Sequence, residues 1–233
     1  MITKRPSAQR GYADHGWLRS FHSFSFADYY DPDHMGFGNL RVINEDVVAP
    51  GTGFGMHPHR DMEIITVILD GALSHRDSMG HGETIRPGEV QYMSAGQGVL
   101  HSEFNQQSDA STHLLQIWIL PEQLGVTPRY AQQSFPVADN AGRLVKVASR
   151  EGDQGSIRIN ADAALYLGRF ERGQQASVAW QPGRLAYVHL AQGQLVVNGE
   201  RLQAGDALMM EDVSTLDFAE GEAAQVLVFD LAR

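Results

Sequence analysis

Two short runs of the chain carry metal-ligand side chains at alternate positions. His57 and His59 are two residues apart, and so are His101 and Glu103. Both runs lie among β-type residues, and a strand points residues i and i+2 to the same face. Two strands that bring these faces together would offer three imidazoles and one carboxylate to a single point. Such a set suits a divalent Fe, Mn, Ni, Cu or Zn ion.

This ligand set predicts a catalytic site rather than a structural one. Four protein ligands on an octahedral metal leave positions open for a substrate or dioxygen. The plainer alternative is a solvated strand face, because the chain has 10 His among 233 residues and a single H-x-H pair can arise by chance. The second run, with Leu100 before it and the turn-forming stretch 94–98 upstream, favours the metal site.

The elements that must position these residues are short β-strands. Helical patterning is scarce, and β-rich runs alternate with Gly, Asp, Asn and Pro, as in an all-β sandwich or barrel. Asp70-Gly71, Pro87-Gly88, Asn198-Gly199 and 204–206 are specific turn signals. The strands expected are Asn39–Val48, Glu63–Leu69, Gly71–Asp77, Glu89–Ser94, Thr112–Leu120, Leu144–Ser149, Leu165–Phe170, Leu185–Ala191, Gln194–Val197 and Gln225–Phe229.

The chain divides into two halves with a faint echo of each other. Residues 69–73 and 85–89 read as strand, glycine turn and strand, and residues 190–195 and 202–206 repeat that order. A duplicated β unit explains the echo. We expect an N-terminal metal-binding domain over 1–120, a crossover with a short helical turn over 121–140, and a C-terminal domain over 141–233. His189 is the only histidine of the last part, so we expect that domain to be metal-free.

Composition excludes several classes of function. The formal net charge is −10 and no run is rich in Lys or Arg, so direct nucleic-acid binding is not expected. The chain has no cysteine, which excludes disulfides, a thiolate zinc site and a thiol nucleophile. No stretch reaches the apolar length of a membrane span, and residues 1–11 lack the apolar run of a secretory signal. These features favour a cytoplasmic protein.

The sequence resembles the pirin family of bicupins. Residues 51–63 fit the first cupin motif, G-x5-H-x-H-x3-E, with its terminal glycine one residue late at Gly71. Residues 88–105 resemble the second motif, although Ser94 replaces the usual proline and the spacing to His101 is longer. The segments 15–18, 21–26, 57–61, 75–80, 93–98 and 101–103 match pirin signatures. The likeness is close over the first half, whereas the second half is a degenerate cupin.

The resemblance implies two facing β-barrel domains (double-stranded β-helices) with one divalent transition metal, Fe, Mn, Ni, Cu, Co or Zn, in the N-terminal barrel. It implies His57, His59, His101 and Glu103 as ligands. General cupins often use the first-motif carboxylate instead, here Glu63. We favour Glu103, which shares a strand face with His101, and expect Glu63 at the edge of the core or beside the ligands. A monomer suffices for such a fold.

The resemblance also implies an activity, quercetin 2,3-dioxygenase, in which O2 cleaves a flavonol ring and carbon monoxide is released. Glu103 is then the expected catalytic base as well as a ligand. The alternative is a regulatory metal-binding protein that acts through protein partners; an enclosed metal would favour it, and a roomy apolar cavity would favour the enzyme. Candidate wall residues are Phe21, Phe24, Phe26, Phe37, Met56, Met93 and Trp118, and candidate partners of the ligands are His22, His75 and His113.

Overall fold

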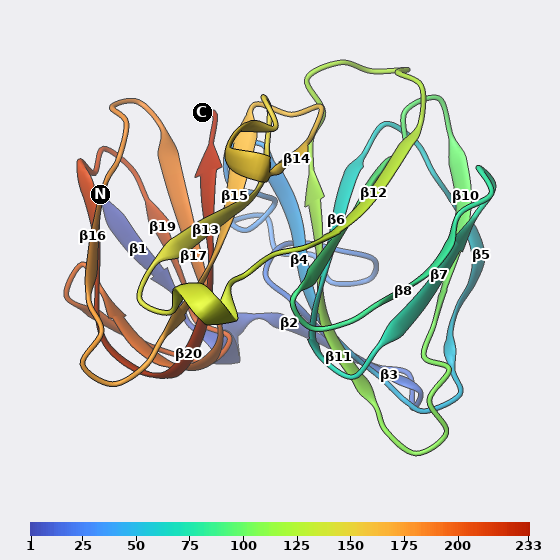
Figure 1. Cartoon of the computed structure of the whole chain (residues 1–233), viewed down its shortest axis with the longest axis horizontal. Helices are drawn as coiled ribbons and strands as arrows, with labels where there is room; N and C mark the ends of the chain where they lie inside the picture. Colours follow the sequence, from blue (N-terminus) through green and yellow to red (C-terminus); the bar gives the residue numbers. More distant parts are fainter.

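The chain folds almost entirely into antiparallel β-strands, as expected. The computed structural model describes residues 1–233. Two lobes lie side by side along the long axis, one built mainly from the first half of the chain and one mainly from the second (Figure 1). Every run expected to be extended overlaps a strand, and several short strands along the chain were not among the expected runs. No helix has the length and apolar composition of a membrane span.

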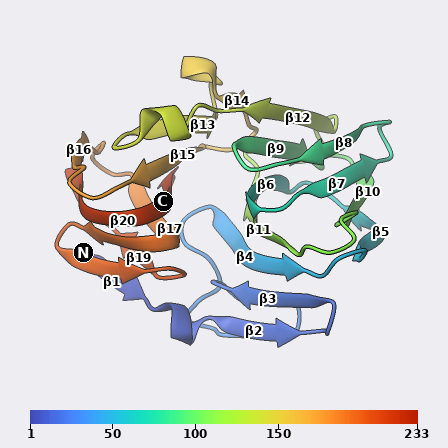
Figure 2. The same ribbon diagram turned by 60° about the horizontal axis from the view of Figure 1, so that its bottom comes forward.

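The first lobe is a sandwich of two sheets. One sheet has the order β12-β9-β6-β11-β4-β3-β2, and the other has the order β5-β10-β7-β8. The two layers face each other in Figure 2. The larger sheet contains β2 (Gly11–Asp14), β3 (Leu18–His22), β4 (Leu40–Val48), β6 (Glu63–Asp70), β9 (Glu89–Ser94), β11 (Thr112–Ile119) and β12 (Arg129–Ser134). The smaller contains β5 (Gly53–His59), β7 (Leu73–Asp77), β8 (Gly82–Ile85) and β10 (Val99–Phe104).

The second lobe is one curled sheet. Its main path is β1-β19-β17-β20-β15-β13-β14, with β16 on β20 and β18 on β17. Three short 3-10 helices accompany the sheets: η1 (Ser7–Gln9), η2 (Ala138–Asn140) and η3 (Asp153–Gly155). The strands are β1 (Ile2–Arg5), β13 (Leu144–Ser149), β14 (Ile157–Arg158), β15 (Ala163–Phe170), β16 (Ala176–Ala179), β17 (Leu185–Val197), β18 (Glu200–Gln203), β19 (Ala207–Met210) and β20 (Thr215–Leu231).

Strand β1 belongs to the sheet of the second lobe, and strand β12 belongs to a sheet of the first lobe. The N-terminal strand β1 pairs with β19 of the second lobe. Strand β12 lies in the segment expected to be a crossover, yet it pairs with β9 of the first lobe, and η2 supplies the short helical turn of that segment. The division at residues 120 and 141 stays a prediction.

The glycine turns behave as expected at four places and differently at a fifth. Asn198 and Gly199 both have positive φ, +48° and +83°, and close the two-residue hairpin between β17 and β18. The turn expected at Gly193 is wrong, because β17 continues through it. The register of β17 against β20 shifts there, and a Cβ on Gly193 would lie 2.2 Å from the Glu222 carbonyl oxygen. Gly193 therefore serves a β-bulge.

The interiors of the two lobes differ in chemistry. A cluster of 15 buried apolar residues, including Phe170, Leu195 and Phe218, fills the second lobe. The first lobe holds two smaller apolar clusters, of 6 and 4 buried residues, and both groups of potential metal ligands lie between its sheets. A larger cluster of 26 residues contains Leu40 and Ile117 of the first lobe and Tyr187 and Phe229 of the second. The lobes thus share a core, and the first keeps room for a site.

Candidate metal centre

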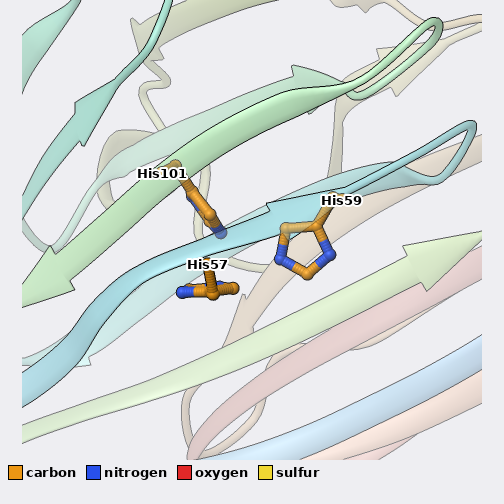
Figure 3. Close-up of side chains that lie close together, drawn as sticks. All are labelled: His57, His59 and His101. Carbon is orange, nitrogen blue, oxygen red and sulfur yellow. The ribbon is translucent and has the colours of Figure 1, made fainter.

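Pairing of β5 with β10 brings the two predicted histidine runs together. The strands are antiparallel, and His101 lies directly opposite His57. Their rings are 4.3 Å apart between centroids, and the His59 ring lies 4.8 Å from each of them. Figure 3 shows the three rings gathered on one side of the two strands. Each ring offers a nitrogen within 4.8 Å of the other two, a group of the size that one ion can hold.

Glu103 falls in a second group rather than joining these three imidazoles. His101 and Glu103 still share one face of β10, because β10 pairs with β7 in regular register and the extra residue of the register shift between β5 and β10 lies on β5. On its other edge β10 pairs with β7, where Glu103 lies opposite His75. His75, His101 and Glu103 offer atoms within 4.8 Å of one another. The two groups share His101.

Unpartnered buried atoms test whether these residues fit a metal. Both ring nitrogens of His101, Nδ1 of His75 and Oε1 of Glu103 are buried and have no hydrogen-bond partner. Buried polar atoms are rarely left unpaired, because each costs free energy comparable to a lost hydrogen bond. Imidazole nitrogens and a carboxylate oxygen are good donors for a divalent transition metal. The residues present therefore fit such an ion.

Burial keeps the imidazoles of His59 and His101 neutral, the form that binds metals. Burial, reinforced by the neighbouring histidines, lowers the pKa of His101 to about 2. Burial and the charge of His57 lower the pKa of His59 to about 4. Burial raises the pKa of Glu103 to about 7, against the opposing hydrogen bond that Gln116 Nε2 donates to its Oε2 at 2.9 Å. At neutral pH the group thus combines lone pairs on nitrogen with a carboxyl close to its titration point.

Neighbouring groups orient some of these rings. Nδ1 of His57 donates to the Gly55 carbonyl oxygen at 2.7 Å, which leaves its Nε2 free for a metal. Nε2 of His75 donates to Asp77 Oδ2 at 3.0 Å. The ring of Trp118 packs edge-on against His59, with centroids 5.0 Å apart. Of the three histidines expected as partners of the ligands, only His75 contacts a ligand ring; the rings of His75 and His101 are 5.3 Å apart.

Glu63 is fully buried and engaged elsewhere, as expected for a residue outside the ligand set. Its carboxylate accepts hydrogen bonds from the Tyr92 hydroxyl, from Ser94 Oγ at 2.6 Å and from the Asn160 backbone N–H at 2.9 Å. Both oxygens are occupied, and Glu63 belongs to neither ligand group. It joins the two lobes instead.

A cavity of about 530 Å³ in the first lobe is lined by neighbours of the ligand residues, although none of the ligand residues lines it. Phe54 lies in its wall, and the ring centroid of Phe54 is 6.3 Å from that of His57. Gln116 also lines it and donates to Glu103. The rest of the lining includes aromatic and polar residues. The aromatic ones are Tyr12, Trp17, Phe26 and Tyr29, and the polar ones include Ser20, His22, Asn44 and Asp46.

Sequence reasoning identified only part of this cavity. Among the expected wall residues Phe26 lines it, and Trp118 packs edge-on against Phe26 at 5.4 Å. Phe24 and Phe37 contact Tyr187 of the second lobe instead, and Met56 is exposed. Trp17 and Phe54 were missed, although both stand inside motifs that point to the site. Gln116 and Asp46 lie in strands whose alternating pattern gave no chemical signal.

The remaining candidate partners of the ligands lie apart from both groups. His22 Nδ1 donates to Asn44 Oδ1 at 2.8 Å and its side chain borders the cavity. His113 Nε2 donates to Glu45 Oε1 at 2.9 Å. The aromatic and histidine residues nearest the centre are therefore His75, Trp118 and Phe54.

Family profiles match both halves of the chain. The Pirin profile matches residues 3–119. A profile described as the quercetinase C-terminal cupin domain matches residues 146–231. These matches confirm the expected pirin-type bicupin fold.

Several relatives match along the whole chain. A protein of Escherichia coli K12 named quercetin 2,3-dioxygenase is 42% identical over 99% of both chains. A relative from Pseudomonas aeruginosa, with the same activity as a provisional name, is 45% identical over 100% of both. A pirin-like protein of Caulobacter vibrioides is 40% identical over 100% of both.

A solved structure is close in both sequence and shape. The crystal structure of a bacterial pirin from Escherichia coli in complex with nickel(II) superposes with a TM-score of 0.94 at 42% identity. The superposition covers 100% of this chain and 99% of that one. A divalent metal in a relative this similar agrees with the donor set of this chain.

Proposed function

Because the chain belongs to the pirin family, we propose that it cleaves a flavonol such as quercetin with O2 and releases carbon monoxide. The observation that carries this proposal is the cavity whose lining includes Phe54, next to His57, and Gln116, next to Glu103. A flavonol is a flat aromatic molecule with several hydroxyls, and the cavity is lined by both aromatic and polar residues. Its volume of about 530 Å³ lies in the range of small-molecule sites.

The proposed metal ligands are His57, His59, His101 and Glu103, and the metal is one divalent transition ion. The nickel(II) complex of the Escherichia coli relative makes nickel the first metal to load. When bound, such an ion acts as a Lewis acid that lowers the pKa of a coordinated hydroxyl.

The chain's own residues have separate roles in this proposal. Glu103 takes the proton of the flavonol 3-hydroxyl, since burial raises its pKa to about 7, close to the working pH. Gln116 holds the Glu103 carboxyl through its 2.9 Å hydrogen bond and also borders the cavity. Phe54 and Trp17, whose rings are 5.1 Å apart, exclude water from the substrate and hold its rings.

The same cavity argues against the regulatory alternative. A metal that serves only a structural or regulatory role has no need of a space for a second molecule beside it. A cavity of this size with both polar and aromatic groups in its lining favours catalysis on a small aromatic compound.

The test is oxygen uptake with carbon monoxide detection on protein loaded with each candidate metal and given quercetin. We expect metal-dependent uptake with one carbon monoxide per O2. Glu103→Gln should lose at least about 100-fold in turnover, the typical share of a general base, while metal affinity falls less. Tight metal binding without uptake for any metal would reject the dioxygenase. Equal loss of turnover and metal in the variant would make Glu103 mainly a ligand.

A further inference from the structure

One region of the cavity is strongly polar, and neighbouring strands of the larger sheet build it. Ser20 of β3 lies directly opposite Asp46 of β4, and His22 lies opposite Asn44. On the other side of β4, Gln116 of β11 also lies opposite Asn44. Alternate residues of a strand share a face, so these side chains meet on the inner face of the sheet, and all of them line the cavity. We call Ser20, His22, Asn44, Asp46 and Gln116 the polar patch.

Asp46 is the acidic member of the patch, and it has no cation beside it. It is 3% exposed and accepts a hydrogen bond from Ser20 Oγ. Arg10 and His113 form their ion pairs with the adjacent Glu45 instead. A carboxylate has about four acceptor sites, so one hydroxyl leaves most of its capacity unused. Because burying a charge without partners costs free energy, this position favours a ligand that brings hydrogen-bond donors.

Asn44 adds hydrogen-bond donors next to this acceptor. Nδ1 of His22 donates to Asn44 Oδ1 at 2.8 Å. Because that oxygen is occupied, the Nδ2 hydrogens of Asn44 are left to donate to an oxygen of a ligand. A hydroxyl both donates and accepts, so it satisfies Asp46 and Asn44 together. An amine cation would satisfy Asp46 alone, and the patch therefore suits hydroxyls.

Aromatic side chains beside the patch suit a ring that carries these hydroxyls. Phe26 and Tyr29 line the cavity, and their ring centroids are 5.4 Å and 6.2 Å from that of His22. At the edge of the patch nearest the metal centre, Gln116 donates to Glu103 at 2.9 Å. In a flavonol the pendant phenyl ring is on the carbon next to the one that carries the 3-hydroxyl. A 3-hydroxyl near Glu103 therefore brings the pendant ring toward the polar patch.

We propose that Asp46 and Asn44 bind two adjacent hydroxyls on the pendant ring of the substrate, so that the protein selects ortho-dihydroxylated flavonols. Both hydroxyls donate to the Asp46 carboxylate, and Nδ2 of Asn44 donates to one of the hydroxyl oxygens. Asp46 and Asn44 determine specificity and take no part in the reaction with O2. This inference rests on the proposed function, because it takes a flavonol as the substrate.

The test compares the binding of three flavonols to the nickel-loaded full chain by calorimetry without O2. Quercetin has two adjacent hydroxyls on its pendant ring, kaempferol has one and galangin has none. We expect quercetin to bind about 10- to 100-fold more tightly than galangin, the range for hydrogen bonds to a charged acceptor, with kaempferol between them. Equal affinities for the three would overturn the proposal. This series uses the wild-type chain, so it does not depend on the folding of a variant.

Asp46→Asn identifies the acceptor, because an ortho-diol also binds metal ions. The amide keeps the shape of the side chain and replaces one acceptor oxygen with a donor. We expect the affinity for quercetin to fall to that for galangin, with the affinity for galangin unchanged. Asp70→Asn is the matched control, since Asp70 is exposed at the end of β6 and does not line the cavity; it should keep the preference for quercetin. A full preference in Asp46→Asn would overturn the proposal and place the diol on the metal.

The binding assays separate this inference from the proposed activity, because they involve no turnover. Protein that prefers quercetin through Asp46 and releases no carbon monoxide would support this inference and reject the dioxygenase. Protein that cleaves quercetin and galangin with equal affinity for both would reject this inference and keep the dioxygenase. Protein that binds none of the three flavonols would reject both.

Discussion

Asp46 is a buried residue of the first lobe, and it lines the cavity described above. It is on β4, only 3% exposed, and it accepts a hydrogen bond from Ser20 Oγ. Burial raises its pKa to about 6, with Ser20 opposing the shift and the adjacent Glu45 adding to it. Placed between Ser20 and Asn44, this carboxyl is suited to a polar group of the substrate.

The pKa of Asp46 predicts a pH-dependent stability. Between about pH 4 and pH 6 the folded chain keeps a proton that the unfolded chain has lost, so the free energy of unfolding falls as pH rises. Over these two pH units the free energy of unfolding falls by about 3 kcal/mol, and the fall is complete above pH 6. Asp46→Asn should remove this loss, which urea unfolding of metal-free protein at pH 4 and pH 7 measures. The exposed Asp28→Asn, beside the same cavity, is the control. Equal pH profiles for wild type and Asp46→Asn would contradict the shift.

At the scale of elements, the contact of β5 with β10 decides whether the histidines meet. The two strands lie close together at Gly53, where an added Cβ would lie 2.2 Å from the Glu103 carbonyl oxygen. A distance below 3.0 Å requires the backbone to move, so the pairing of these strands requires glycine there. Two residues further along the same strand, Gly55 has open space around its Cβ position.

Gly53→Ala should therefore disturb both stability and metal binding. We expect a loss of about 1–3 kcal/mol in the free energy of unfolding, the usual cost of overpacking. Nickel affinity should fall as well, because the shift separates His57 from His101. Thermal unfolding and calorimetric titration measure the two effects. Gly55→Ala should affect neither, and a similar response of both variants would show that sterics at Gly53 are not the cause.

At the scale of the whole molecule, the two lobes behave as one body because they share apolar and polar contacts. The cluster of 26 buried residues crosses between them. Within the first lobe, Glu63 receives three hydrogen bonds, one of them from the Asn160 backbone N–H of the second lobe. At the surface, Arg150 Nη2 donates to Glu122 Oε1 at 2.5 Å. Because Glu63 is buried and the Arg150–Glu122 pair is at the surface, we expect the Glu63 hydrogen bonds to contribute more to the free energy of unfolding.

Glu63→Ala should destabilise the protein far more than Glu122→Ala. Removing Glu63 leaves three donors at a buried site without their acceptor, which costs about 3 kcal/mol or more. Removing the exposed Glu122 costs about 1 kcal/mol or less, as for surface ion pairs. Urea unfolding compares the two. An equal loss in both variants would show that the Glu63 contacts contribute no more than a surface pair.

Local patterns in the sequence were sufficient for the β architecture and for three members of the site. Alternating apolar residues and glycine turns depend on near neighbours, so the strands and the Asn198-Gly199 hairpin could be predicted. His57 and His59 share a strand face by spacing alone. The same reasoning put Glu103 on the strand face of His101, and these two lie in one group together with His75, which no local pattern indicated.

The tertiary structure alone decided what lies around that core of three imidazoles. The regular pairing of β10 with β7 puts His75 opposite Glu103, and the register shift between β5 and β10 sets where Glu103 lies relative to His57 and His59. The engagement of Glu63 depends on Asn160, 97 residues away, and the cavity is assembled from strands on both sheets. The sequence by itself determined the donors and their strand faces, because both follow from side-chain type and a period of two. Their grouping was decided only by register and packing between distant strands, which no local pattern encodes.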